Sequence, residues 1–328
     1  MESQNDKKAL NWVILLALAL VWGSSFILMK RGLDVFSSSQ VAAIRIFFAF
    51  LFLSPLLFRH IKKDLLAHWK AFLGMGLCGN LIPAFLFTKA ETGISSSLAG
   101  MLNSLTPLFT VITGVLFFGS KTRWQNIVGV LIGLAGAVGL MASKSNAIPG
   151  QHSEPLYSLY VVAATILYAL SVNIIGKYLK GVSPITAAVW ALFFIGPMAG
   201  IYLFSTDFIT VMQVHSGAWK ALGYVSLLGI FGTALSVIIF NLLIRNSNPV
   251  FASSVTYLIP VVALVWGVFD GESVEFMHFV WIAVILGGVY LVNSKVKPPA
   301  ESLEKPVLKS SPLRWVNEQG GGKGDEIP

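Results

Sequence analysis

One charged residue, Arg45, lies inside an apolar stretch of the chain. If that stretch is a membrane-spanning helix, the arginine costs about 2.5–3.5 kcal/mol on insertion scales and requires a water-filled cavity or a polar partner. Its planar guanidinium matches a carboxylate or a phosphate, so Arg45 is a candidate for binding an anionic group of a substrate. The alternative is a structural arginine that reaches outward to water or bonds to carbonyls at a helix end.

Two prolines occupy similar apolar stretches later in the chain. Each removes one backbone hydrogen bond and frees the carbonyl four residues earlier, where polar side chains cluster. Freed carbonyls and polar side chains at mid-membrane depth are typical of a cavity lining, although the prolines could instead only bend their helices while hydroxyls bond along their own backbone. The residues predicted to line this cavity are Asn103, Thr106 and Pro107 in one stretch and Thr256, Tyr257 and Pro260 in the other.

Aromatic residues with nearby serines form the third group, Trp22 with Ser25 and Tyr168 with Ser171. An aromatic ring beside small hydroxyls suits an apolar pocket that orients its ligand through a few polar contacts. Serines are also common as small packing residues between membrane helices. We predict a substrate-binding role for all three groups, with no catalytic residue, no cofactor and no metal ligand.

The elements that must position these residues follow from composition. The 328 residues are 55% hydrophobic and 12% charged, about half of the roughly 25% charged share of soluble domains. This composition excludes an ordinary soluble enzyme. Only helices and closed barrels satisfy backbone amides in lipid, so the apolar runs of about 20 residues predict an all-α polytopic membrane protein. Its ten transmembrane helices are expected at about 10–30, 38–58, 69–88, 95–118, 124–142, 156–177, 184–204, 217–242, 249–269 and 276–294.

The net charge of +8 gives the orientation of these helices. Seventeen Lys and Arg residues fall on the side that holds both termini and five on the opposite side, so the positive-inside rule predicts both termini in the cytoplasm and the chain in the cytoplasmic membrane. The positive excess is therefore a topology signal from a protein in a lipid bilayer, and we expect no nucleic-acid partner. Residues 1–9 are a cytoplasmic N-terminus, 143–155 an extracytoplasmic linker and 295–328 a disordered cytoplasmic tail.

The chain also matches itself. A shift of 146 places Trp22 on Tyr168 and Ser25 on Ser171, and a shift of 153 places Pro107 on Pro260. Residues 10–142 and 156–294 are therefore predicted to be two copies of one five-helix unit. Because five is odd, the second copy enters the membrane inverted, an arrangement typical of secondary transporters. The alternative is a duplication that only builds a stable helical bundle.

Several of these motifs resemble the EamA family of the drug/metabolite transporter superfamily. They are Trp22-Gly23-Ser24-Ser25-Phe26, Arg45 within Ala42-Ala43-Ile44-Arg45-Ile46-Phe47, the prolines at 107 and 260, and Gly271-Glu272. The sequence departs from the family at two positions. Gly119-Ser120 in the first repeat lacks the glutamate that follows Gly271 in the second repeat, and Ala191 in the second repeat stands at the position of Arg45 in the first. The resemblance implies ten helices and the export or exchange of small metabolites such as amino acids.

We therefore predict a secondary transporter that works by alternating access, not an enzyme. No acid or His lies firmly within a span, which disfavours a buried proton relay; Glu91, beside Lys89, is the exception to follow. The alternatives are a channel, and a polytopic membrane enzyme or lipid-handling protein. The latter would use the cluster Asp270, Glu272, Glu275 and His278, which could hold a hard cation. Glycines at 129, 133, 136 and 139, with Gly287 and Gly288, suit close packing within the bundle or in a homodimer.

Overall fold

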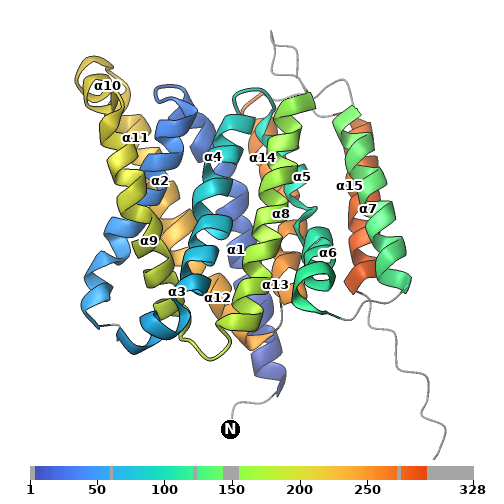
Figure 1. The fold of residues 1–328 in the computed structure, drawn as a ribbon. Coiled ribbons are helices and arrows are strands. Elements are labelled where there is room, and N and C mark those ends of the chain that lie inside the picture. Colours follow the sequence, from blue (N-terminus) through green and yellow to red (C-terminus); the bar gives the residue numbers. More distant parts are fainter. Residues whose placement is uncertain are drawn as a thin grey trace, which may run out of the picture. The chain divides into compact units, whose positions relative to one another are not determined.

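The computed structural model describes residues 4–59, 62–120, 124–142, 155–247, 249–271 and 275–293, and these residues are helical apart from turns (Figure 1). Residues 143–154 of the predicted linker, the predicted tail and Glu272 lie outside the described residues, and Pro155, the last residue of the predicted linker, begins a helix. The α-helices are α1 (Gln4–Leu33), α2 (Ser38–Leu53), α3 (Lys62–Gly76), α4 (Ile82–Ala90), α5 (Ser96–Asn103), α6 (Thr106–Phe118), α7 (Trp124–Ala142), α8 (Pro155–Tyr178), α9 (Pro184–Ser205), α10 (Phe208–Val214), α11 (Ala218–Leu227), α12 (Ser236–Asn246), α13 (Pro249–Ser253), α14 (Ile259–Phe269) and α15 (Phe276–Asn293).

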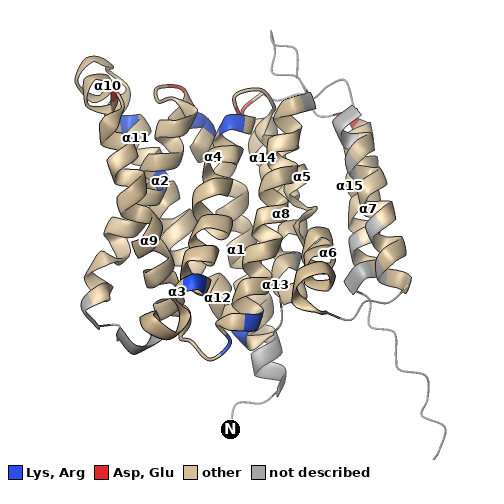
Figure 2. Cartoon of the chain, in the orientation of Figure 1, with Lys and Arg blue, Asp and Glu red and all other residues tan. Residues whose placement is uncertain are grey.

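Eight of the predicted spans are helical segments long and apolar enough to cross a membrane. Each lies within a few residues of its predicted range: 9–33, 38–57, 65–90, 96–118, 156–178, 184–205, 218–246 and 249–269. The other two predicted spans coincide with α7 and α15, which contain shorter apolar helices at 127–136 and 276–288. Charged residues gather toward the ends of the helices, as a membrane-spanning arrangement requires (Figure 2). Ten spans therefore remain a prediction, while the all-helical membrane fold is confirmed.

Four of the long spans are not continuous α-helices. A π-helical segment, Leu77–Leu81, joins α3 to α4, and a second one, Leu228–Leu235, joins α11 to α12. Two residues separate α5 from α6, and a 3₁₀ turn, Ser254–Tyr257, separates α13 from α14. Such interruptions expose backbone groups that a regular helix would hide, and they are tolerated in membranes where they face protein or a cavity.

Helices α2 and α9 begin in the same way. The Ser37 hydroxyl accepts a hydrogen bond from the Gln40 amide, and the Ser183 hydroxyl accepts one from the Thr186 amide, at 3.3 and 3.4 Å. These serines satisfy amides that the first turn of a helix leaves without partners, which fixes where each helix starts. The helices then pack against each other.

The glycine-rich helices α7 and α15 pack against each other along one edge of the described part (Figure 1). A Cβ added to Gly288 would lie 2.5 Å from the Gly129 carbonyl oxygen, and one added to Gly136 would lie 2.9 Å from the Ile285 amide nitrogen. The glycines thus allow the two backbones to approach within one chain. This packing accounts for the glycine pattern, which therefore gives no support to a homodimer.

Candidate functional site

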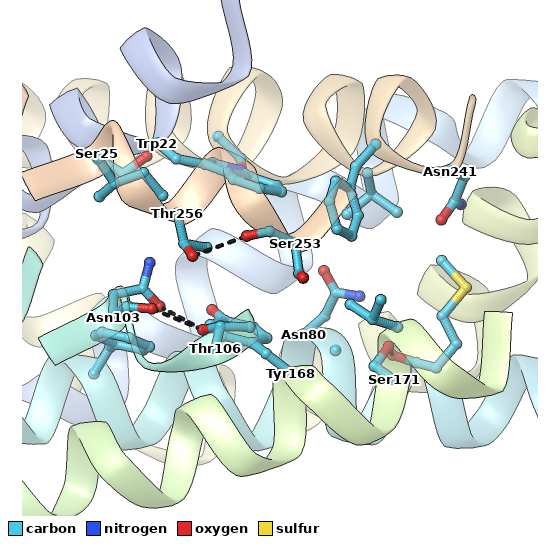
Figure 3. Close-up of a pocket in the computed structure, with 18 of the residues that line it drawn as sticks. Trp22, Ser25, Asn80, Asn103, Thr106, Tyr168, Ser171, Asn241, Ser253 and Thr256 are labelled. Carbon is cyan, nitrogen blue, oxygen red and sulfur yellow. Dashed lines mark hydrogen bonds between the residues drawn. The ribbon is translucent and has the colours of Figure 1, made fainter. Parts of the chain in front are cut away.

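A cavity of about 870 Å³, open solvent at its mouth included, lies among the long helices (Figure 3). Eight of the eleven residues predicted from the sequence line it: Trp22, Ser25, Arg45, Asn103, Thr106, Tyr168, Ser171 and Thr256. Pro107, Tyr257 and Pro260 are not among its lining residues. The predicted groups, which are distant in sequence, therefore meet at one cavity, and the two prolines do not line it.

Helix α1 presents one face to the cavity. Trp22, Ser25, Phe26 and Met29 all line it, and their spacing of three, four and seven residues is that of one helix face. Helix α8 presents Tyr168, Ser171, Val172 and Ile175 with the same spacing. The two sets differ by 146 residues at every position, so the shift found in the sequence also relates the cavity-lining faces.

Arg45 lines the cavity from α2, and the hydrogen-bond partner of its side chain is a polar, uncharged hydroxyl. Its Nε donates a hydrogen bond to the Thr233 hydroxyl at 2.7 Å, and its guanidinium lies within hydrogen-bonding range of the Tyr168 hydroxyl. Glu91, buried at the end of α4, attracts the guanidinium electrostatically but is not a lining residue. The guanidinium is therefore held in position at the cavity wall, where its remaining donors can bind a ligand.

The expectation that each proline removes a hydrogen bond from a continuous helix is wrong. Pro107 and Pro260 lie in the first turns of α6 and α14, where a missing amide hydrogen leaves no bond unmade. The α-helix is interrupted before each of these prolines. At the first break the Thr106 hydroxyl donates to the Asn103 carbonyl oxygen at 2.8 Å, so this carbonyl is not free.

The second break is capped in a related way. The Thr256 hydroxyl donates to the Ser253 carbonyl oxygen at 2.9 Å, and Figure 3 shows both capped breaks at the same cavity. The cavity therefore receives side chains at the breaks: the Asn103 amide and the Thr106 hydroxyl from one, and the Ser253 and Thr256 hydroxyls from the other.

The serines and Trp22 use part of their bonding capacity within the protein. Ser25 donates to the Val21 carbonyl oxygen of its own helix at 2.9 Å. The indole Nε1 of Trp22 donates to the Gly232 carbonyl oxygen at 2.9 Å, and its ring lies edge-on to Phe240, with 5.1 Å between centroids. Trp22 is thus held rigidly and presents an aromatic surface to the cavity.

Several lining residues were missed as site residues in the sequence analysis. Phe26 and Met29 follow from helical spacing once Trp22 and Ser25 are placed on one face. Phe87, Phe240 and Ser253 had no distinguishing signal, because phenylalanine and serine are common throughout the apolar runs. Asn80 and Asn241, also in the lining, were polar residues that nothing in the sequence ranked.

A second cavity adjoins the first on the side of the helices where α1 begins. Ile175 and Asn241 line both cavities. The second cavity is formed where α8 and α12 end and where α9 and α13 begin (Figure 1), and it carries Lys180 and Arg245. We call it the vestibule, defined by Lys180, Pro184, Arg245, Ser247 and Pro249 together with the two shared residues.

The opposite side is held by ion pairs between α1 and the end of α14. The Lys30 ammonium lies 2.6 Å from a carboxylate oxygen of Asp270, and the Arg31 guanidinium binds the other oxygen. Asp270 is therefore engaged by two cations. In the part of the chain that the structure describes, no three His, Cys, Asp or Glu side chains gather to hold a metal ion. The cation site considered for Asp270, Glu275 and His278 thus receives no support.

Comparison with known proteins agrees with the fold. The EamA-like transporter family matches residues 10–142 and 155–294. The uncharacterized inner membrane transporter YedA of Escherichia coli K12 is 28% identical over 90% of this chain and 95% of its own length. A probable amino-acid metabolite efflux pump of Salmonella typhimurium LT2 is 25% identical over 84% and 92%, respectively.

Two further similarities are more limited. The aromatic amino acid exporter YddG of Salmonella typhimurium 14028s is 29% identical over 30% of this chain and 38% of its own length. A solved crystal structure superposes with a TM-score of 0.59 at 17% identity, covering 87% of this chain and 96% of that one, which shows a shared fold. With the family match extending over most of the described helices, this chain belongs to the EamA-like transporter family.

Proposed function

We propose that the protein is a secondary transporter that exports or exchanges small metabolites by alternating access through the central cavity. The observation that carries this proposal is the cavity itself: faces of α1 and α8, related by one sequence shift, line it together with side chains from two broken helices. Matched halves around a central site are the architecture in which each half can in turn close one side. The substrate-binding roles of the eight predicted lining residues belong to this proposal.

Reciprocal packing supports the inverted repeat. Helix α1 packs on α14, and α8, its counterpart, packs on α6, the counterpart of α14. In the same way α2 packs on α11 and on the π-helical segment that follows it, and α9 packs on α3 and on the π-helical segment that follows that helix. A two-fold axis in the membrane plane would exchange these two sets of contacts. We infer ten spans in two five-helix halves, with α7 and α15 as the fifth and tenth.

The two sides of the cavity suggest the step that transport requires. Ion pairs of Lys30 and Arg31 with Asp270 join the halves on the far side, while the vestibule lies on the N-terminal side. By the positive-inside rule the N-terminal side faces the cytoplasm. A substrate would enter from the vestibule, and release would require the ion pairs to open. This direction, together with the exporter and efflux names of two relatives, favours export of small metabolites that are amino-acid-like or related to amino acids.

The test is a comparison of metabolites excreted by cells that lack, carry or overexpress the protein. We expect at least one small metabolite to accumulate outside in proportion to expression. The control is Asn80→Phe, which fills the cavity; its folding is verified by size-exclusion chromatography, and it should reduce release to the level of the deletion strain. Identical excreted profiles for all strains, across a broad metabolite range, would contradict the proposal.

A further inference from the structure

The described residues that line the two cavities carry charge of one sign. Arg45 is the charged residue of the central cavity, and Lys180 and Arg245 are those of the vestibule. Within the described residues, no Asp or Glu lines either space. The central cavity otherwise presents mainly apolar side chains with neutral amides and hydroxyls, so the charges that a substrate would meet at these described residues are positive.

Resting on the transport function proposed above, we propose that the substrate is a small organic monoanion, a carboxylate on an apolar body of aromatic size, drawn in through the vestibule. A single guanidinium balances a single negative charge, so a carboxylate fits better than a doubly charged phosphate ester. Arg45 offers this group a charge-assisted hydrogen bond, which is shorter and stronger than a neutral one.

The body of the substrate is indicated by the aromatic walls. Phe87 and Tyr168 stack with ring centroids 5.8 Å apart, and Trp22 meets Phe240 at 5.1 Å. All four rings line the cavity. Aromatic and apolar surfaces bind a ring or a branched chain, and the few polar groups fix its orientation.

The lining also argues against recognition of an ammonium group. A buried cation requires an anionic or strongly polar partner, and no Asp or Glu is among the described residues that line the cavity. An α-ammonium would meet amide and hydroxyl oxygens and aromatic rings, while Arg45 would repel it. A simple carboxylate is therefore favoured over the matching zwitterionic amino acid.

The vestibule adds a kinetic effect to this selectivity. Lys180 and Arg245 lie at the side where the substrate would enter, and a cleft with one sign of charge raises the local concentration of the opposite ion. The effect weakens as salt shortens the screening length, which is about 8 Å at physiological ionic strength. The association rate should therefore depend on the salt concentration, while the strength of the hydrogen bond between the substrate and Arg45 should depend on it less.

The experiment uses four probes that share one phenyl ring and one chain length: 3-phenylpropionate, phenylalanine, 3-phenylpropionamide and phenethylamine. Their binding to the purified full-length protein is measured by isothermal titration calorimetry. We expect 3-phenylpropionate to bind about ten- to a hundredfold more tightly than its amide, the range that a charged hydrogen bond supplies. Phenylalanine should be weaker than 3-phenylpropionate, and the amine should not bind.

A preference for the amide, the amine or phenylalanine would overturn the inference while leaving transport of another substrate class intact. Binding of none of the four would also overturn it. In both cases the metabolite-release experiment decides on transport separately, because it assumes no substrate class.

Vestibule variants provide the second arm. Stopped-flow tryptophan fluorescence follows association of 3-phenylpropionate with Lys180→Gln, Arg245→Gln and the double variant. We expect the double variant to associate several-fold more slowly at low salt, with dissociation unchanged. Lys70→Gln, which removes an exposed charge of α3 that does not line the vestibule, is the matched control. Equal association rates for all variants at low salt would contradict a steering role.

Discussion

Helices α2 and α9 occupy corresponding places in the proposed repeat but differ at one side chain. Each is approached by a glycine from the other half: a Cβ on Gly229 would lie 2.7 Å from the Arg45 carbonyl oxygen, and one on Gly76 would lie 2.7 Å from the Ala191 carbonyl oxygen. The backbone contacts are therefore the same, whereas the side chains are an arginine and a methyl group. The comparison teaches that the two helices share a backbone contact and that only one of them carries a charge at this position.

This asymmetry has a physical reason. A second arginine at the buried position 191 would add another insertion cost of about 2.5–3.5 kcal/mol and a second positive charge within the same helical bundle. With one arginine, the cavity favours one orientation of the bound substrate. A bound carboxylate would lie toward α2, and the apolar body of the substrate would lie among the aromatic rings.

The largest expected effect comes from breaking the shared backbone contact. Gly229→Leu and Gly76→Leu should each destabilise the protein by about 3 kcal/mol or more, because the carbonyl that the new side chain meets cannot move aside. Yield and thermal unfolding of the purified variants measure this loss. Gly223→Leu on α11, where an added Cβ meets nothing within 4 Å, is the control. Normal stability of both buried variants would refute the common packing.

Replacing the arginine tests what is special to α2. Arg45→Lys keeps the charge but loses the planar fork, so we expect binding of 3-phenylpropionate to weaken about tenfold, which corresponds to about 1.4 kcal/mol. Calorimetry on the folded variant measures the change. Wild-type affinity in the lysine variant would exclude two-pronged recognition of the carboxylate.

The support of the arginine should matter less than the arginine itself. Thr233→Val removes the hydroxyl that accepts from Nε, and the loss of this hydrogen bond costs about 1 kcal/mol. We expect a several-fold weaker binding of 3-phenylpropionate with little change in the affinity for its amide. An equal loss for both probes would show that Thr233 shapes the cavity and does not position Arg45.

The smallest effect should appear in both proposed halves. Ser37→Ala and Ser183→Ala each remove an N-cap, with an expected cost of about 0.5–2 kcal/mol measured by thermal unfolding. The cost at Ser37 should be the larger, because Gln40 completes a capping box there. A clear loss at only one of the two serines would separate helices that the proposed repeat treats as equivalent.

Much of the site could be predicted from the sequence because helical spacing and the internal shifts act together. The shift of 146 places the faces of Trp22 and Tyr168 on each other, and an arginine in an apolar run marks itself by its cost. These signals are local or periodic. In the structure, the residues that these signals marked come from five separate stretches of the chain and line one cavity.

The remaining features depend on three-dimensional contacts that carry no local signal. A proline in an apolar run indicates a bend or a break equally well, and the Thr106 hydroxyl that caps the Asn103 carbonyl settles the choice only in the folded chain. Lys180 and Arg245 counted only as charges on one side of the membrane. Their place in a vestibule follows from the meeting of four helix ends.

The central claim is that Arg45 recognises the carboxylate of the substrate. A cycle of two proteins and two ligands tests it most directly: wild type and Arg45→Gln, each titrated with 3-phenylpropionate and 3-phenylpropionamide. We predict that the wild type prefers the carboxylate by about ten- to a hundredfold and that Arg45→Gln loses this preference while binding the amide as the wild type does. An undiminished preference for the carboxylate in folded Arg45→Gln would contradict the account.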